Sequence, residues 1–454
     1  MTMTVNAGAR LDRLPVSSFH YRIFWLIGAG MFFDGYDLYV GGSMLGAAVH
    51  SHFSTLSQTQ WFVSLTFVGM TIGSLLAGFL GDHYGRRFTY QFNLMIFGLA
   101  SLLAAFVQDM DQLIALRFVM GLGLGAEIVV GYSTMTEFAP PATRGKWLSF
   151  MAFIVVAGYP VTAILGTLII PGFGWRPMFV VAGIGALVVW YLRKRLPESP
   201  RWLEAQGRHA EAEALLREIE REVAPEGGLP PPTPVETGPV WTLGALFSPS
   251  LLPRLVVGCV VLITANTLIF GFVNWIPTFF VQQGLSLTKS FAYALVIALG
   301  SPFGCAIGAF FADRFGRRRC IIGASLMTIV FGGLYPFVAA TWLLLGVGFL
   351  LIVGIYILTA ILYGAYTSEL FPTEIRLRAN GFCNMLGRGV TIVTPLIVIA
   401  LFRTYGVGGV LGLMIGLLVL QIAVVAAWGP EPARRGLETL DPEAGAAAAR
   451  VQTV

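Results

Sequence analysis

The sequence is poor in charge and in the residues that bind metals or form disulfide frameworks. Only 12% of its 454 residues are charged, roughly half the ~25% share of a soluble domain. Its four cysteines are scattered in apolar stretches without a Cys-x-x-Cys pattern, and its five histidines are dispersed. This spacing supports neither a metal site nor a disulfide framework. We therefore expect no catalytic centre, no metal and no cofactor, and predict that the protein is not an enzyme.

Long apolar runs recur along the whole chain instead. Hydrophobic residues make up 56% of the sequence, and the mean hydropathy is +0.76. About 20 such residues suffice to cross the hydrocarbon core of a bilayer. The runs predict an all-α membrane protein with twelve transmembrane helices, near 22–46, 58–80, 88–107, 112–136, 147–170, 176–195, 255–281, 287–311, 319–340, 342–366, 382–402 and 408–428.

The positive charges follow the predicted topology. With the N-terminus in the cytoplasm, nearly all of the 29 Lys and Arg residues fall in cytoplasmic segments. Only Arg176, Lys289 and Arg403 lie outside, and Arg117 and Arg388 lie within spans. This asymmetry is the positive-inside rule, so the basic pI of about 9.1 reflects topology and not a nucleic-acid partner. We expect a multi-pass protein of the inner membrane with both termini cytoplasmic.

Two motifs recur at nearly one offset and indicate an internal duplication. The loop 81–87 (GDHYGRR) returns as 312–318 (ADRFGRR), 231 residues later when counted from aspartate to aspartate. Glu137, which is followed by Phe-Ala-Pro, returns as Glu369 at an offset of 232. Such a repeat predicts two parallel six-helix bundles related by an axis along the membrane normal, with a substrate site between them near the midplane.

The domain boundaries follow from the longest polar segment. Residues 1–203 form the predicted N-terminal bundle, and residues 251–454 the C-terminal bundle with a short tail. Between them, 204–250 reads as a cytoplasmic linker with a short charged helix at 209–222 and a Pro-rich run at 229–234.

The paired loops also carry a family resemblance. They resemble the signature of the major facilitator superfamily, and 196–203 (LPESPRWL) resembles the sugar-porter form of that loop. The resemblance implies the two-bundle fold, a monomer, and a cytoplasmic gate of charged residues; plain anchoring by positive charge is the alternative reading. The gating candidates are Asp82, Arg86, Arg87, Glu137, Arg144, Asp313, Arg317, Arg318, Glu369 and Arg376.

Ionisable residues inside spans are functional candidates because they are costly to bury. At a rise of 1.5 Å per residue, Asp37 and Arg117 both lie roughly 8 Å below the outer face. In proton-coupled sugar porters an Asp of the first span and an Arg of the fourth couple protons to transport, and Asp37 and Arg117 match those positions. We predict proton coupling at Asp34, Asp37, Arg117 and Glu127, with a static ion pair as the alternative for Asp37 and Arg117. Glu127 is either a second protonation site or the partner of a loop arginine.

The substrate candidates divide between two families. The seventh span lacks the Gln-Gln-x-x-Gly pattern of sugar porters, whereas 274–278 (NWIPT), with 34–37 (DGYD), resembles the aromatic acid–proton symporter group. We also expect Pro277 to kink the seventh span. Asn380, Asn384 and Arg388 repeat every four residues and form one polar stripe, in which Arg388 either grips an anion or anchors the helix end. The substrate-binding candidates are Tyr36, Asn274, Trp275, Asn384 and Arg388.

Taken together, the residues favour proton symport of a small organic acid, aromatic or sugar-derived. The alternative is a proton-coupled sugar or polyol porter, followed by a facilitator, an antiporter or a non-transporting sensor. The expected partners are the small-molecule substrate, protons and the lipid bilayer.

Overall fold

The computed structural model contains helices and no strand in the part of the chain that it describes. That part comprises residues 5–141, 143–224, 228–231, 247–249, 251–338, 340–371 and 376–431. Nine helical segments within it are long and apolar enough to cross a membrane, and the one at Ala379–Trp428 has the length of two spans. The chain divides into two compact units, Met1–Thr237 and Gly238–Val454.

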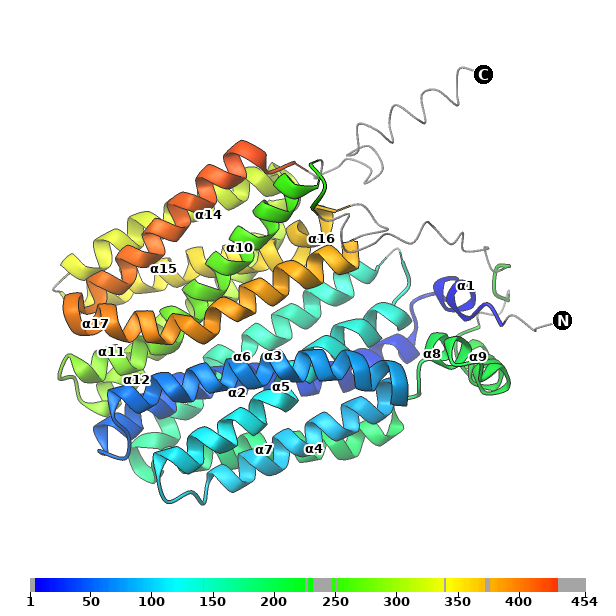
Figure 1. Cartoon of the computed structure of the whole chain (residues 1–454), viewed down its shortest axis with the longest axis horizontal. Helices are drawn as coiled ribbons and strands as arrows, with labels where there is room; N and C mark the ends of the chain where they lie inside the picture. Colours follow the sequence, from blue (N-terminus) through cyan, green and yellow to red (C-terminus); the bar gives the residue numbers. More distant parts are fainter. Residues whose placement is uncertain are drawn as a thin grey trace. The chain divides into compact units, whose positions relative to one another are not determined.

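Unit 1 (Met1–Thr237) is a bundle of long helices with three short helices at one end. Its elements are α1 (Ala7–Asp12), α2 (Ser18–His50), α3 (Leu56–Tyr84), α4 (Arg86–Ala104), α5 (Met110–Phe138), α6 (Arg144–Phe173), α7 (Arg176–Leu192), η1 (Arg193–Arg195), α8 (Pro200–Ala205) and α9 (His209–Val223). Helices α1, α8 and α9 lie together at one end of the bundle, which we call the α9 end (Figure 1).

Unit 2 (Gly238–Val454) repeats the bundle with more interruptions. Its elements are α10 (Leu252–Gly271), η3 (Val273–Trp275), α11 (Ile276–Gln282), α12 (Leu287–Ala298), α13 (Gly300–Phe315), α14 (Arg317–Leu334), η4 (Tyr335–Phe337), α15 (Thr341–Ile361), η5 (Leu362–Tyr366), α16 (Thr367–Glu369) and α17 (Arg376–Trp428). Gly406 interrupts α17 with φ of 62°, where the eleventh predicted span turns into the twelfth.

The seventh predicted span is interrupted in the turn directly before its proline. Helix α10 ends at Gly271, and the chain passes through Phe272 and a 3₁₀ turn before α11 begins. Pro277 lies in the first turn of α11, where a missing N–H costs nothing. The predicted kink of this span at Pro277 is therefore confirmed, because a proline disturbs the helical turn that precedes it, where its ring would clash with the carbonyl of the residue four positions earlier.

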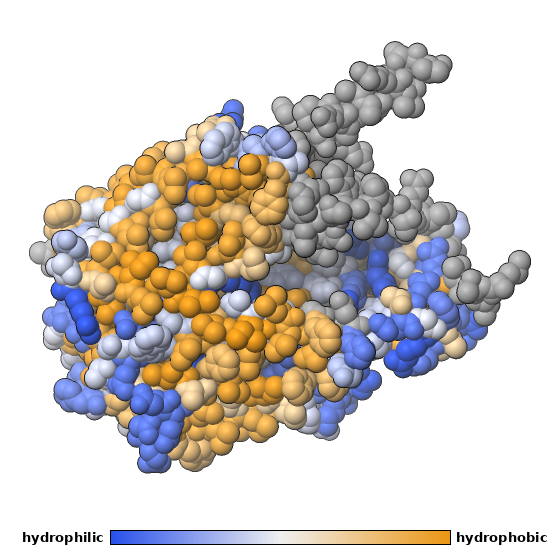
Figure 2. Space-filling model, viewed as in Figure 1, coloured by the Kyte–Doolittle hydropathy of each residue, from blue (hydrophilic) through white to orange (hydrophobic). Residues whose placement is uncertain are grey.

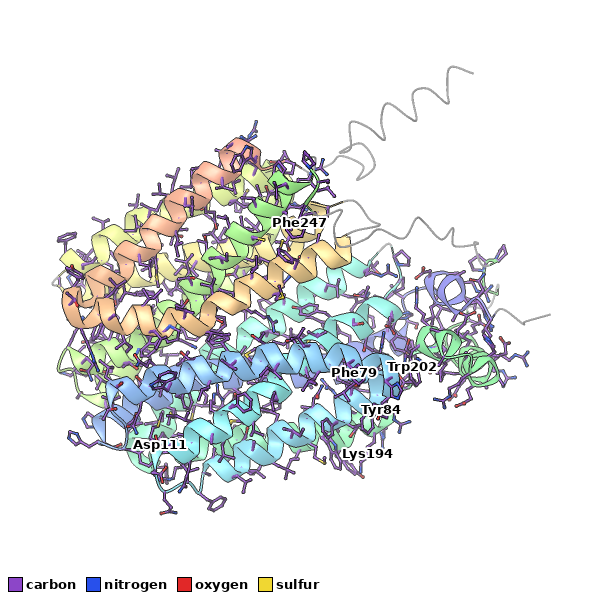
Figure 3. The ribbon with its side chains drawn as sticks, in the orientation of Figure 1. Phe79, Tyr84, Asp111, Lys194, Trp202 and Phe247 are labelled. Atoms are coloured by element: carbon purple, nitrogen blue, oxygen red, sulfur yellow. The ribbon has the colours of Figure 1, made fainter. Side chains whose placement is uncertain are left out.

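The surface agrees with a membrane environment. Figure 2 shows apolar side chains over the flanks of the long helices, and hydrophilic side chains gathered over α8 and α9. Exposed Phe79, Leu75 and Leu168 belong to this apolar covering. In Figure 3, Tyr84, Lys194 and Trp202 mark the α9 end of unit 1, and Asp111 marks the opposite end.

Glycines allow the helices that carry the site to approach closely. A methyl group at Gly35 of α2 would lie 2.1 Å from the carbonyl oxygen of Val155 in α6. Opposite it, a methyl group at Gly158 of α6 would lie 2.4 Å from the backbone nitrogen of Tyr36. Helices α2 and α6 therefore touch backbone to backbone, as small residues permit in membrane bundles. This contact fixes the segment of α2 that carries Asp34 and Asp37.

Candidate functional site

The first part of the site is a buried ion pair between α2 and α5. Arg117 donates a short hydrogen bond to the side chain of Asp37, and both side chains are 2% exposed or less. The guanidinium also donates to the backbone carbonyl of Asp37 at 2.9 Å and to the Thr66 hydroxyl at 3.1 Å. It lies over the ring of Phe62, with 5.0 Å between the guanidinium carbon and the ring centroid. Asp37 and Arg117 are thus brought together as their predicted depths require.

A second buried ion pair lies nearer the α9 end. Arg193 of η1 donates a short hydrogen bond to Glu127 of α5, and both side chains are 1% exposed or less. Its other nitrogens donate to the backbone carbonyls of Leu26 and Ile27 in α2, each at 2.7 Å. The guanidinium lies over the ring of Tyr90, 4.6 Å from its centroid. The two pairs therefore share one arrangement. In each, the arginine bonds a carboxylate, donates to a backbone carbonyl oxygen of α2 and lies over an aromatic ring.

Sequence reasoning missed Arg193. It lies with Lys194 and Arg195 at the end of the predicted span 176–195, and all three are among the positive charges assigned to the cytoplasmic side. The available signal was Glu127, since a carboxylate at that depth requires a cation within reach. The structure pairs Glu127 with Arg193, which matches the second of the two readings of Glu127; its protonation role stays a prediction.

Asp34 lies between the two pairs. It is 1% exposed, and neither of its carboxylate oxygens has a hydrogen-bond partner among the described residues. It is one helical turn from Gly30, whose α-carbon faces both Arg193 and Glu127, and less than one turn from Asp37. Glu127, Arg193 and Asp37 all act on it electrostatically. An unpaired carboxylate in such a place is costly as an anion, so it is suited to hold a proton.

Two of the predicted substrate residues serve packing in this structure. Tyr36 is 1% exposed, and its hydroxyl donates to the backbone carbonyl of Met178 in α7 at 3.2 Å. Trp275 is equally buried, and its indole nitrogen donates to the carbonyl of Phe270 at 3.0 Å. Asn274 is 8% exposed in the same 3₁₀ turn. Substrate binding by these three stays a prediction.

Unit 2 contains a polar cluster that sequence reasoning found only in part. Asn266 of α10 points at α17, where its amide nitrogen would lie 3.0 Å from a methyl group at Gly387. Its side chain interacts with Tyr363 of η5, on which the charge of Arg388 also acts. Tyr363 stands in a π-helical turn, a form frequent at functional sites. We call Asn266, Tyr363, Asn384 and Arg388 the polar cluster of unit 2.

The predicted stripe on α17 lies at the edge of this cluster. Asn384 donates to the carbonyl of Asn380 at 2.9 Å, and both side chains are half-buried, as is Arg388. A sequence period finds the stripe because all of its members are on one helix. It does not find Asn266 or Tyr363, which come from two other elements.

The loop after α3 is organised by a glutamate from outside the loop. Gly85 has φ of 94°, and the backbone nitrogen of Arg86 donates to Glu198 at 2.8 Å. The carboxylate thus caps the N-terminus of α4. Burial raises the pKa of Glu198, against the backbone N–H groups that stabilise its charge. The side chain of Arg86 reaches Glu137 at 3.1 Å, and Arg87 donates to the carbonyl of Lys194.

Unit 2 repeats this arrangement residue by residue. Gly316 also has φ of 94°, and the backbone nitrogens of Arg317 and Arg318 donate to Glu431 at 2.8 Å and 3.0 Å. The side chain of Arg317 reaches Glu369 at 3.2 Å. Glu198 and Glu431 were not among the predicted site residues. The signal was a third repeat, Pro-Glu at 197–198 and 430–431, at an offset of 233.

The remaining gating candidates divide into two groups. Arg144 pairs with Asp12 at 3.0 Å, and Arg318 donates to the carbonyl of Ala426. The side chains of Asp82, Asp313 and Arg376 lie outside the described part of the structure.

A transporter family model, described as sugar (and other) transporter, matches residues 24–444. The chain belongs to this family. It is 39% identical over 449 residues to the inner membrane metabolite transport protein YdjE of Escherichia coli (strain K12). This match covers 95% of this chain and 98% of YdjE. It is 29% identical over 443 residues to the niacin transporter NiaP of Acinetobacter baylyi, and this match covers 95% of this chain and 99% of NiaP.

The crystal structure of a D-xylose-proton symporter matches the fold with a TM-score of 0.71 over 91% of this chain and 99% of that chain, at 19% identity. The predicted major facilitator fold and sugar-porter likeness are thus confirmed. The protein is a multi-pass membrane transporter of the sugar and metabolite type, and its substrate is a small molecule.

Proposed function

We propose that this transporter is a proton-coupled symporter that takes up a small organic acid. The observation that carries the proposal is Asp34, a buried carboxylate without a hydrogen-bond partner in the described structure, beside the Asp37–Arg117 pair. One group can hold a proton there, and a neighbouring pair can open and close as the bundle moves. Inward proton flow would then drive the substrate.

The coupling follows from the electrostatics of Asp37. Its charge is offset by one guanidinium in a site from which water is excluded. If Arg117 turns away during the transport cycle, the carboxylate loses its compensation and takes up a proton. Protonation and helix position would thus change together, which is what a symporter requires.

The acid preference rests on the polar cluster of unit 2. Arg388 offers a charged, planar donor, and Asn266 and Tyr363 offer neutral polar groups for the rest of the solute. Niacin, which the relative NiaP is named for, is a small aromatic carboxylic acid. The second candidate is a sugar or polyol, because the same amide and phenol groups suit hydroxyl ligands, and the D-xylose-proton symporter shares the fold.

We further propose an inner-membrane location with the α9 end in the cytoplasm, and a working monomer. The inner-membrane location is supported by the name of the relative YdjE, and the orientation by the excess of Lys and Arg at the α9 end. The Arg86–Glu137 pair of unit 1 would then be cytoplasmic and part of the gate. We assign the Arg317–Glu369 pair of unit 2 the same role because it recurs in the duplicated loop.

The test is uptake into proteoliposomes with and without an imposed pH gradient. Labelled nicotinate, 4-hydroxybenzoate, gluconate and xylose are compared side by side. We expect one acid to accumulate only with the gradient, and Arg388→Gln to raise its KM about ten- to hundredfold, since a charged hydrogen bond contributes about 1.5–3 kcal/mol. The exposed Arg403→Gln is the matched control. Gradient-driven uptake of xylose but of no acid would replace our proposal by the second candidate.

A further inference from the structure

The Glu127–Arg193 pair is not used by the coupling scheme above. Arg193 sits where a side chain of residue 30 would be, because a methyl group at Gly30 would lie 2.0 Å from one guanidinium nitrogen and 2.6 Å from Glu127. The guanidinium therefore crosses α2 directly, one helical turn from Asp34. Only a glycine at position 30 leaves room for this crossing.

The charges buried at this level do not balance. Among the described residues of unit 1 that are 2% exposed or less, the carboxylates are Asp34, Asp37 and Glu127, and the guanidiniums are Arg117 and Arg193. Three negative charges against two positive ones leave one uncompensated charge in a medium of low dielectric, which is strongly unfavourable. One carboxyl group must therefore keep its proton. Asp37 and Glu127 each bond an arginine, so the proton belongs to Asp34.

No other described charge competes at this position. Asp34 is faced by Glu127 from α5, Arg193 from η1 and Asp37 from its own helix. Helix α6 meets this stretch of α2 through the backbone of Gly158, and α4 contributes the ring of Tyr90 beneath Arg193. Glu127 also has a second carboxylate oxygen without a hydrogen-bond partner in the described structure. It can accept a proton without first breaking its bond to Arg193.

We propose that Asp34 and Glu127 form a proton relay in which Arg193 is the positioning residue. When the two carboxyl groups approach to hydrogen-bond distance, or one water bridges them, the O–H bond of Asp34 breaks and an O–H bond forms on Glu127, so that the negative charge moves from Glu127 to Asp34. The guanidinium of Arg193 stays bonded to the carbonyl oxygens of α2 and compensates whichever of the two carboxylates carries the charge. The number of buried charges is unchanged by this transfer. Glu127 then releases the proton to water at the α9 end, which leaves both carboxylates charged beside Arg193 until Asp34 takes up the next proton.

The relay extends the proposed symport, since it assigns the path by which the coupled proton leaves. It makes a prediction that a static pair does not. In Glu127→Gln two carboxylates face two guanidiniums, so Arg193 pairs with Asp34, which loses its proton. The variant should keep substrate exchange and lose coupling.

The experiment measures two quantities in proteoliposomes for the acid that the parent protein accumulates. One is substrate exchange without a gradient, and the other is accumulation under a gradient of one pH unit, which a one-proton symporter can drive to about tenfold. For Glu127→Gln we expect exchange within about threefold of the parent and no accumulation, a loss of about 1.4 kcal/mol of coupling. Arg195→Gln, two residues from Arg193 but exposed, should match the parent in both.

The role of Arg193 is tested by accumulation and by the pH profile of exchange, which a role in packing alone would not change. Arg193→Lys keeps the charge and should retain accumulation with a shifted pH profile of exchange, whereas Arg193→Gln should abolish accumulation. The double variant Glu127→Gln/Arg193→Gln leaves no unpaired buried charge; it should fold and exchange substrate without accumulating it, and serves if a single variant misfolds.

Accumulation by Glu127→Gln equal to that of the parent would overturn the relay, as would accumulation by the folded double variant. These results are distinct from failure of the proposed function, in which the parent protein itself does not respond to the gradient.

Discussion

A methyl group at Gly35 should separate the two helices that hold the proton site. The methyl of Gly35→Ala would lie 2.1 Å from the Val155 carbonyl oxygen, whereas ordinary contact begins at 3.4 Å. Helices α2 and α6 must therefore part by about 1.3 Å (3.4 − 2.1), and neither backbone can rotate aside. Overpacking of this kind costs about 1–3 kcal/mol.

The displacement falls between Asp34 and Asp37, so transport should suffer as well as stability. We expect a lower melting temperature in detergent and an exchange rate reduced about tenfold or more, since a misplacement of about 1 Å can cost a hundredfold. Thermal unfolding followed by tryptophan fluorescence and exchange in proteoliposomes measure the two effects.

Gly28→Ala is the matched control. It lies two turns earlier on the same face of α2, and its methyl would meet only the terminal methyl of Ile154, at 2.9 Å, which can move. We expect near-parental melting and exchange. If Gly35→Ala matched Gly28→Ala in both measurements, the backbone contact would not determine the position of the two aspartates, and the reasoning would fail.

Three further predictions concern the α9 end and the loop caps. Gly316→Ala should lose about 1–3 kcal/mol in unfolding experiments, because its φ of 94° suits glycine and a methyl group would meet Glu431 at 2.6 Å. Glu198→Ala should cost about 1 kcal/mol through the lost cap on α4, measured by thermal unfolding; an unchanged melting temperature would contradict the cap. The hydrogen bond from Arg10 of α1 lowers the pKa of Glu220 in α9. Docking of α1 against α9 should therefore hold above about pH 4.3 and weaken as the pH falls through the lowered pKa of Glu220. Limited proteolysis of residues 5–14 as a function of pH measures this, with Arg10→Ala as the undocked reference.

Much of the fold could be predicted from the sequence because it depends on one-dimensional signals. A span is a run of apolar residues, and depth along a span follows from the rise per residue, which is why Asp37 and Arg117 could be matched before their contact was seen. The duplicated loops 81–87 and 312–318 are also a signal along the chain, since they recur at one offset, and they predict two halves.

The rest of the site depends on which elements meet. Arg193 looks like its neighbours Lys194 and Arg195 in sequence, and only the packing of η1 against α2 buries it. The π-helical turn that carries Tyr363 is a local backbone form that composition does not specify. Glu198 and Glu431 could have been found, since a third repeat marks them.

Arg117 holds position 37 twice, through the carboxylate and through the backbone carbonyl of the same residue. A substitution such as Asp37→Asn removes the charge but leaves the main-chain bond, and so the arginine keeps a fixed point on α2. Functional loss in that variant would therefore report on charge separately from geometry. Position 37 is in this sense a built-in control for experiments on the cycle.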